Sequence, residues 1–215
     1  MIGDDLSGDG EAQATAPGTA APRGVGSPEP VEHMRQRVRC DSRAGVEDLD
    51  DRLRLLAAQR TLPCGLRLLI IEGYRPLSLQ TTYFESYKDE LRRRYPEWDS
   101  ARRHVEASKY ISPPEVAPHS TGGTVDLTLC TAEGVELDLG TIVNASPVDG
   151  ANACFTGSPD ISPQARTNRG ILGHALSSAG MVNYPTEWWH WSFGDRYWAL
   201  STETARTRYG PVDLT

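Results

Sequence analysis

The sequence predicts a single α+β domain in which helices flank an antiparallel sheet. Two short apolar runs, at 66–71 and 125–129, have the length and composition of buried strands. A third stretch has a helical period instead, because apolar and aromatic side chains recur every four residues at Leu79, Tyr83, Tyr87, Leu91 and Tyr95. Helices and strands that alternate irregularly in this way pack as helices against one sheet, which is the α+β class.

The N-terminal part of the chain separates into a tail and the start of the domain. Residues 1–32 are rich in Gly, Ala, Pro, Ser and acidic residues, so they cannot bury enough apolar surface to offset their ordering entropy. We expect them to be a disordered tail, with the domain covering 33–215. Residues 34–40 alternate basic and apolar side chains, as in an edge strand. An amphipathic helix is predicted over 45–60 from apolar residues at helical spacing, Val46, Leu49, Leu53 and Leu56.

The rest of the chain follows in order. The strand 66–71 is predicted to be central in the sheet, and the helix 79–95 is predicted to stop at Pro96, with arginines 92–94 in solvent. A helix is expected over 100–108, followed by a loop over 110–118, a turn near 133–134 and a return segment over 138–145. Residues 146–160 are expected to form a flexible excursion that covers the cleft. A helix is then expected from Pro163, capped by Ser162 and ended at Gly180, followed by strands over 181–184, 188–193 and 197–201.

Composition excludes several classes of protein. A net charge of -7 leaves no basic footprint for nucleic acid, and no apolar run is long enough to span a bilayer. The first residues lack the basic and apolar regions of a signal peptide, so a cytoplasmic location is expected. The four cysteines form no C-x-x-C pair and are expected to be buried thiols, with a bridge between Cys130 and Cys154 left open.

The first motif with chemical meaning is Pro185-Thr-Glu187-Trp188-Trp189-His190-Trp191. An acid three residues before a histidine, inside a run of tryptophans, suits a metallohydrolase: the imidazole holds a divalent metal and the carboxylate takes a proton from water. The alternative is that the tryptophans are core residues and the Glu187–His190 pair is solvated. On a regular strand these two side chains would face opposite ways, so Glu187 is expected in the turn before the strand.

A second motif, His119-Ser-Thr-Gly-Gly-Thr-Val-Asp126, strengthens the metal interpretation. The odd spacing would send both side chains to opposite faces of a straight strand, but Gly122 and Gly123 allow the chain to bend. With His190, the motif supplies two imidazoles and one carboxylate and leaves a fourth position open, which is the arrangement of a catalytic zinc site. The sequence therefore predicts one Zn²⁺ per chain, bound in a cleft on one face of the sheet. His104 and His174 are expected to be surface or packing histidines.

Together these stretches resemble the zinc D-alanyl-D-alanine dipeptidases and the related DD-carboxypeptidases. The likeness lies in H-x6-D followed by E-W-W-H, in Glu72-Gly-Tyr-Arg75-Pro76, and in Asp138-Leu-Gly-Thr141 between the two ligand groups; it runs from about residue 66 to 198. The resemblance implies zinc-assisted hydrolysis of D-Ala-D-Ala, with Glu187 as general base and Arg75 assisting at the scissile carbonyl. Trp188 and Trp189 are expected to shape and dry the substrate site.

The chain departs from the family where the substrate's ammonium group is held. The dipeptidases have a serine two residues before the first histidine ligand and an aspartate shortly after the D-x-G-T segment; the matching residues here are Ala117 and Asn144. This leaves open a carboxypeptidase or amidase acting on a larger peptide or secondary metabolite. A zinc-stabilised binding module is a further alternative, although Glu187 and Arg75 argue against it. The expected partner is a small peptide, and the sequence does not indicate an oligomeric state.

Overall fold

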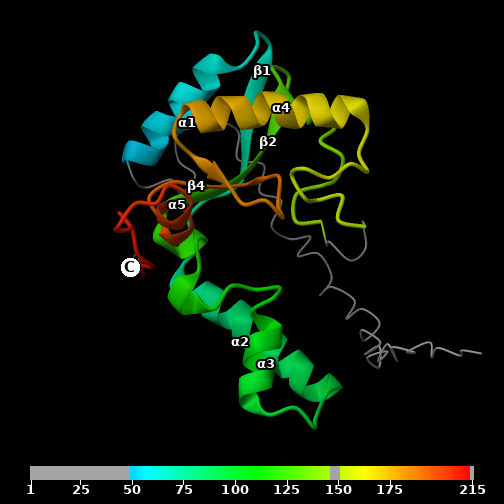
Figure 1. The fold of residues 1–215 in the computed structure, drawn as a ribbon, viewed down its shortest axis with the longest axis vertical. Coiled ribbons are helices and arrows are strands. Elements are labelled where there is room, and N and C mark those ends of the chain that lie inside the picture. The colour runs from blue at the N-terminus through cyan, green and yellow to red at the C-terminus, as the bar shows by residue number, and fades with distance from the viewer. Residues whose placement is uncertain (1–48, 146–150, 214–215) are drawn as a thin grey trace, which may run out of the picture.

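The computed structural model describes residues 49–145 and 151–213, which form an α+β fold around one antiparallel sheet (Figure 1). The predicted tail, the strand at 34–40 and the first residues of the predicted helix 45–60 lie outside the described residues. The helices are α1 (Leu49–Thr61), α2 (Leu77–Arg94), α3 (Ser100–Ala107), α4 (Pro163–Ser178) and α5 (Arg196–Ser201), with short 3-10 turns η2 (Pro114–Val116) and η3 (His119–Thr121).

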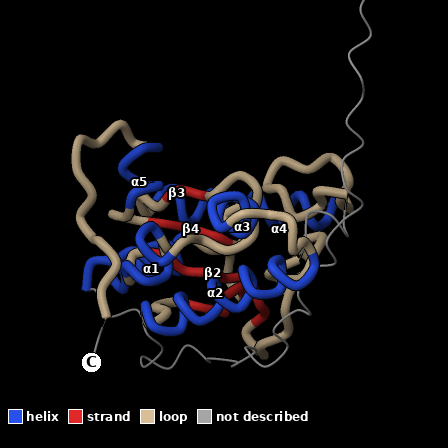
Figure 2. The backbone as a smooth tube through the Cα atoms, turned by 90° about the horizontal axis from the view of Figure 1, so that it is seen from below, coloured by secondary structure: helices blue, strands red, loops and turns tan. Residues whose placement is uncertain are grey.

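The sheet has four strands in the order β1-β2-β4-β3, all antiparallel. In Figure 2, β2, β4 and β3 lie side by side across the middle of the molecule with helices around them. The strands are β1 (Leu66–Glu72), β2 (Thr124–Thr131), β3 (Val182–Asn183) and β4 (His190–Ser192). Among the described strands β1 lies at an edge, whereas 66–71 was predicted to be central. The edge strand predicted at 34–40 lies outside the described residues, so the predicted position of 66–71 stays a prediction. The central strands are β2, every residue of which is buried except its last, and β4.

The register of the sheet aligns three chemically active residues in one row. Asp126 on β2 pairs with His190 on β4 and, across an irregularity in β1, with Glu72. Neighbouring residues in such a row have side chains within reach of one another. The sheet therefore places residues that are far apart in sequence beside each other.

The main core lies between the sheet and the pair α1 and α4, which pack together over it in Figure 1. Leu55 and Ala58 form the buried face of α1, whereas Leu53 and Leu56 are each 53% exposed. The stripe predicted from helical spacing thus identified the helix but not its buried side. Helix α4 begins and ends as predicted: the Ser162 side chain accepts from the Ala165 N–H at 3.0 Å, and Gly180 follows the last turn with φ of 81°.

Helices α2 and α3 form a separate arm that extends from the sheet in Figure 1. Its own small core contains the buried residues Phe84, Tyr87, Leu91 and Ala107. Arginines 92–94 are exposed, as predicted, and so is His104. Gln80 is the polar exception, since it is buried at the start of α2.

A flexible excursion was expected over 146–160; residues 146–150 lie outside the described residues, and residues 151–160 are anchored. Arg169 on α4 is buried and donates hydrogen bonds of 2.7 Å to the carbonyl oxygens of Leu139, Ala153 and Phe155. A charged donor that satisfies several buried carbonyl groups contributes more than a neutral hydrogen bond. The segment also reaches the Glu187 turn, because the Thr156 N–H donates to the Pro185 carbonyl at 2.9 Å.

The described cysteines form no disulfide with one another. Cys130 and Cys154 are buried, as expected, but Cys64 is exposed. The bridge left open between Cys130 and Cys154 is therefore not formed.

The C-terminal residues 197–201 form helix α5 and not the predicted third strand. The cause is Asp195, whose carboxylate accepts from the Trp198 N–H at 2.7 Å and from the Thr124 hydroxyl at 3.1 Å. This N-cap fixes the first turn of the helix and ties it to β2. A strand pattern of alternating apolar residues does not reveal such a cap.

Asp195→Ala should lower the free energy of unfolding by about 2–3 kcal/mol, because both a helix cap and a buried hydrogen bond are lost. Asp99→Ala is the matched control: Asp99 also caps a helix, accepting from the Arg102 N–H at 2.7 Å, but it is exposed. Its loss should be near 1 kcal/mol. Urea unfolding measures both, and an Asp195 variant no less stable than the Asp99 variant would contradict the buried-cap account.

Candidate metal centre

His119 lies on a tight turn and not on a strand. The 3-10 turn η3 ends at Gly122, whose φ of 74° is left-handed and favours glycine. The ring Nδ1 lies 2.9 Å from the Gly73 carbonyl oxygen, and the Arg75 N–H donates to the His119 carbonyl at 3.1 Å. Since a carbonyl only accepts, Nδ1 carries a proton, so Nε2 is the nitrogen that offers a lone pair to a metal ion when the ring is neutral.

Asp126 and His190 are direct neighbours across β2 and β4, and His119 closes the group from the turn. Asp126 Oδ1 lies 2.9 Å from His190 Nδ1, and Asp126 Oδ2 lies 3.4 Å from His119 Nε2. One ligand atom from each residue lies within 4.8 Å of the others. All three side chains are buried, and the structure brings the His119–Asp126 motif and His190 together.

The electrostatics of this cluster fit a cation at its centre. Burial favours neutral forms, yet the interaction with Asp126 prevails and raises the pKa of His119 to about 9. The two imidazoles in turn hold the pKa of Asp126 far below its usual range against the effect of burial. A buried carboxylate of this kind needs a positive partner. Two imidazole nitrogens and a carboxylate oxygen are zinc ligands, so the donor set fits a divalent zinc ion.

Glu187 lies in the turn before β4, as predicted. Its N–H donates to the Tyr184 carbonyl at 2.9 Å, and its Oε2 lies 3.7 Å from His190 Nδ1. The side chain is 39% exposed, so it reaches the metal group from the solvent side. Partial burial raises the pKa of Glu187, opposed by the nearby histidines. A carboxylate with a raised pKa beside a metal site is suited to general-base work.

Arg75 is delivered just after β1 and is held by two side chains. Its Nε and Nη2 donate to Glu72 at 2.6 and 2.5 Å, and its Nη1 donates to Gln80 at 2.7 Å. Burial disfavours the charge, but Glu72 prevails and keeps the pKa of Arg75 raised. Both partners were missed in the sequence. The Glu-x-x-Arg spacing was a usable signal for Glu72, whereas nothing local indicates Gln80.

A cavity of about 340 Å³ opens beside the metal group, with Glu187 and His190 in its wall. Tyr184 and Tyr197 form an aromatic side of this cavity that was not predicted; their rings meet edge to face with centroids 5.0 Å apart. A second cavity, of about 330 Å³, lies along residues 136–143 and includes the Trp188 side chain.

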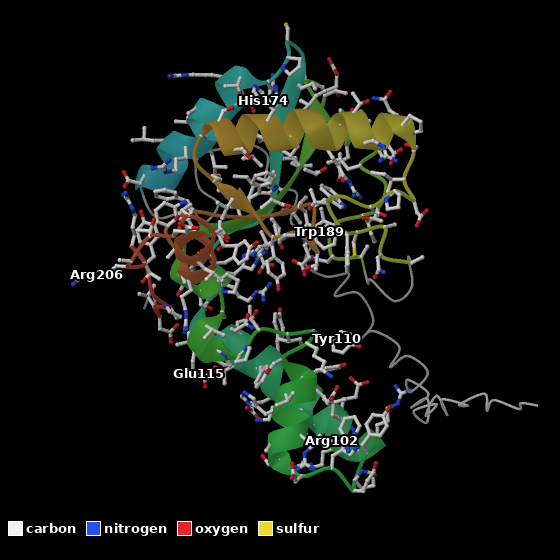
Figure 3. The ribbon with its side chains drawn as sticks, in the orientation of Figure 1. Arg102, Tyr110, Glu115, His174, Trp189 and Arg206 are labelled. Atoms are coloured by element: carbon white, nitrogen blue, oxygen red, sulfur yellow. The ribbon has the colours of Figure 1, made fainter. Side chains whose placement is uncertain are left out.

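The predicted substrate-contacting residues are spread over several environments. Trp188 and Trp189 are each 2% exposed and belong to the main core; the Trp188 ring N–H donates to the Thr141 hydroxyl at 2.8 Å. Ala117 is fully buried, and Asn144 is exposed with a left-handed φ of 62°. Figure 3 shows His174 on the outer side of α4, away from Trp189, and it is exposed, in accord with the prediction of a surface or packing histidine.

Three buried side chains that could hold a metal ion, a carboxylate at their edge and an arginine held nearby are the arrangement expected of a metal-dependent hydrolase. Residues 40–206 match a family model described as D-ala-D-ala dipeptidase. The chain therefore belongs to the D-Ala-D-Ala dipeptidase family and is a zinc metallopeptidase.

Individual relatives share less than a third of their aligned residues with this chain. A D-alanyl-D-alanine dipeptidase from Synechocystis is 29% identical over 179 residues, which cover 73% of this chain and 70% of that protein. One from Escherichia coli is 28% identical over 127 residues, covering 59% and 54%. A solved structure of VanY, a vancomycin resistance D,D-pentapeptidase in complex with Zn(II), aligns with a TM-score of 0.39 and 17% identity over 68% of this chain and 71% of that one. That alignment is too weak to bear on the site.

Proposed function

We propose that this protein hydrolyses the peptide bond of a small D-amino-acid peptide, most directly D-Ala-D-Ala, with one zinc ion per chain. The observation that carries the proposal is the convergence of His119, Asp126 and His190 with Glu187 at the edge of the group. His119 would bind through Nε2 and His190 through Nδ1, since these nitrogens face the Asp126 oxygens. Zinc would supply Lewis acidity, which polarises a carbonyl and lowers the pKa of water so that it can lose a proton and attack near neutral pH.

The protein's own groups account for the proton transfers and the developing charge. Glu187, at the cavity wall, accepts the proton of the attacking water and returns it to the leaving amine. Arg75, fixed by Glu72 and Gln80, has two N–H groups left to donate to the oxygen that becomes negative. The aromatic wall of Tyr184 and Tyr197 limits access of bulk water, which strengthens these interactions. We infer that Trp188 and Trp189 act from the core, by shaping the surrounding walls.

The second candidate is a carboxypeptidase or amidase acting on a larger substrate. Two residues favour it: Ala117 supplies no hydroxyl, and Asn144 supplies no charge for a substrate ammonium group. An ammonium beside a carboxylate gains a charge-assisted bond about twice as strong as a neutral one. A pure binding module is a weaker alternative because it would have no need for the Glu187 and Arg75 arrangement.

The two substrates are distinguished by comparing kcat/KM for D-Ala-D-Ala and N-acetyl-D-Ala-D-Ala. Because Ala117 offers no hydroxyl and Asn144 offers no negative charge to the amine, we expect a preference for the free dipeptide well below about a thousandfold, the equivalent of about 4 kcal/mol. Asn144→Asp should raise that preference, and an Asn152→Asp variant serves as the control, since Asn152 is also exposed with a left-handed φ, of 64°. A thousandfold preference in the wild type would restore the strict dipeptidase assignment.

The cellular location stays a prediction. The described helices include none that is long and apolar enough to cross a bilayer. We propose a cytoplasmic location and a small peptide as the partner, and we assign no oligomeric state.

A further inference from the structure

Gln80 is a buried amide that links the catalytic arginine to the arm. Its side chain is 1% exposed in the first turn of α2. Its Oε1 accepts from Arg75 Nη1 at 2.7 Å, and its Nε2 donates to the Ser112 carbonyl at 2.6 Å. A buried amide is costly unless both ends are hydrogen-bonded, and here both are.

The link fixes a pair of side chains that would otherwise move together. Glu72 binds Arg75 along one edge of the guanidinium, through Nε and Nη2. Both partners have rotatable stems and are partly exposed, 17% for Glu72 and 18% for Arg75, so this pair can swing as a unit. Gln80, on α2, accepts a hydrogen bond from the third guanidinium nitrogen, Nη1. Only with this third contact is the guanidinium held from two directions.

We propose that Gln80 is a positioning residue, which holds Arg75 in the orientation that presents its two remaining N–H groups to the scissile carbonyl oxygen. Preorganised donors stabilise developing charge without reorganising during the reaction, and a misplacement of about 1 Å costs on the order of a hundredfold in rate. The proposal rests on the function proposed above for Arg75. It extends the site from the sheet to the first turn of α2, 5 residues after the arginine.

The competing explanation is that Gln80 only stabilises the fold by holding the loop at Ser112. Two variants separate these roles because both lose the amide donor to Ser112. Gln80→Met also loses the acceptor for Arg75, whereas Gln80→Glu keeps an oxygen there. Gln59→Met is a matched control: Gln59, on α1, also uses both ends of its amide but contacts only backbone groups, donating to the Leu66 carbonyl at 3.0 Å and accepting from the Leu68 N–H at 2.8 Å.

For zinc-loaded protein with D-Ala-D-Ala, Gln80→Met should lower kcat by about tenfold to a hundredfold with a smaller change in KM. Gln80→Glu should stay within about threefold of wild type in kcat, although its Tm falls as in the Met variant. Gln59→Met should lower Tm and leave kcat unchanged. Gln80→Asn, whose shorter side chain withdraws the oxygen from Arg75, replaces the Met variant if that variant does not fold.

A second readout needs neither metal nor substrate. In metal-free protein, the NMR signal of the Arg75 Nε–H, assigned through loss in Arg75→Lys, should be sharp and slow to exchange in wild type and Gln80→Glu and broadened in Gln80→Met. Wild-type kcat in Gln80→Met, equal losses in the Met and Glu variants, or an unchanged Arg75 signal would each overturn the proposal. If wild-type protein hydrolyses none of the peptides, the proposed function fails, and the NMR comparison still decides whether Gln80 orients Arg75.

Discussion

Glu187→Gln is expected to keep the fold and the zinc content and to lose a factor of about 100 to 10,000 in kcat, the usual contribution of a general base. The glutamine has nearly the same shape but does not accept a proton at neutral pH. The geometry supports a specific loss, because Glu187 Oε2 lies 3.7 Å from His190 Nδ1 in the wall of the cavity. Steady-state kinetics with D-Ala-D-Ala, at matched zinc content, measure the effect.

Glu85→Gln is the control for this substitution. Glu85 is likewise a partly exposed carboxylate with a nitrogen partner, Lys88 Nζ at 2.8 Å, but it lies on the arm. Its kcat should equal that of wild type. If Glu187→Gln stays within a few-fold of wild type, some other group takes the proton, and the assignment of Glu187 as base is wrong.

His119→Ala and His190→Ala are expected to lose zinc and activity together. Each removes one of three ligands from a buried group, and the remaining carboxylate and single imidazole form an incomplete site. Zinc measured by elemental analysis after gel filtration should fall from about one per chain to below about a tenth. Full zinc retention in both variants would show that the ion binds elsewhere.

His174→Ala is the matched control, because His174 is exposed on the outer side of α4, away from Trp189 (Figure 3), and is not part of the candidate metal group. It should retain both zinc and activity. Circular dichroism on the ligand variants establishes that a loss of zinc does not follow from a loss of fold.

The candidate metal group of His119, Asp126 and His190 could be predicted from sequence because each motif has a local signal. The glycines after His119 predicted a bend, and η3 ends at Gly122 with a left-handed φ. A turn before His190 was predicted from Pro185 and because Glu187 and His190, three residues apart, would face opposite sides of a regular strand. The structure has this turn. In both places a local backbone rule determines which way a side chain points.

What the sequence did not predict depends on contacts across the fold. The partners of Arg75 come from β1 and α2, and only the folded chain brings Glu72 beside Asp126. The order of the described strands, with β1 at an edge, follows from pairing over long sequence separations and not from apolar content. Leu53 and Leu56 share a helical stripe, yet the packing of α1 on α4 buries Leu55 instead. Helix α5 replaced a predicted strand because of one buried cap, Asp195.

The most direct test of a zinc peptidase centre is the release of D-alanine from D-Ala-D-Ala as zinc is returned to metal-stripped protein. We expect no turnover without metal, a rise in rate up to about one equivalent of zinc per chain, and no further rise beyond that. Including N-acetyl-D-Ala-D-Ala in the same titration covers the alternative substrate. The assignment of a zinc peptidase centre would be contradicted if metal-stripped protein hydrolysed either peptide at the full rate. It would also be contradicted if protein with one equivalent of zinc hydrolysed neither peptide.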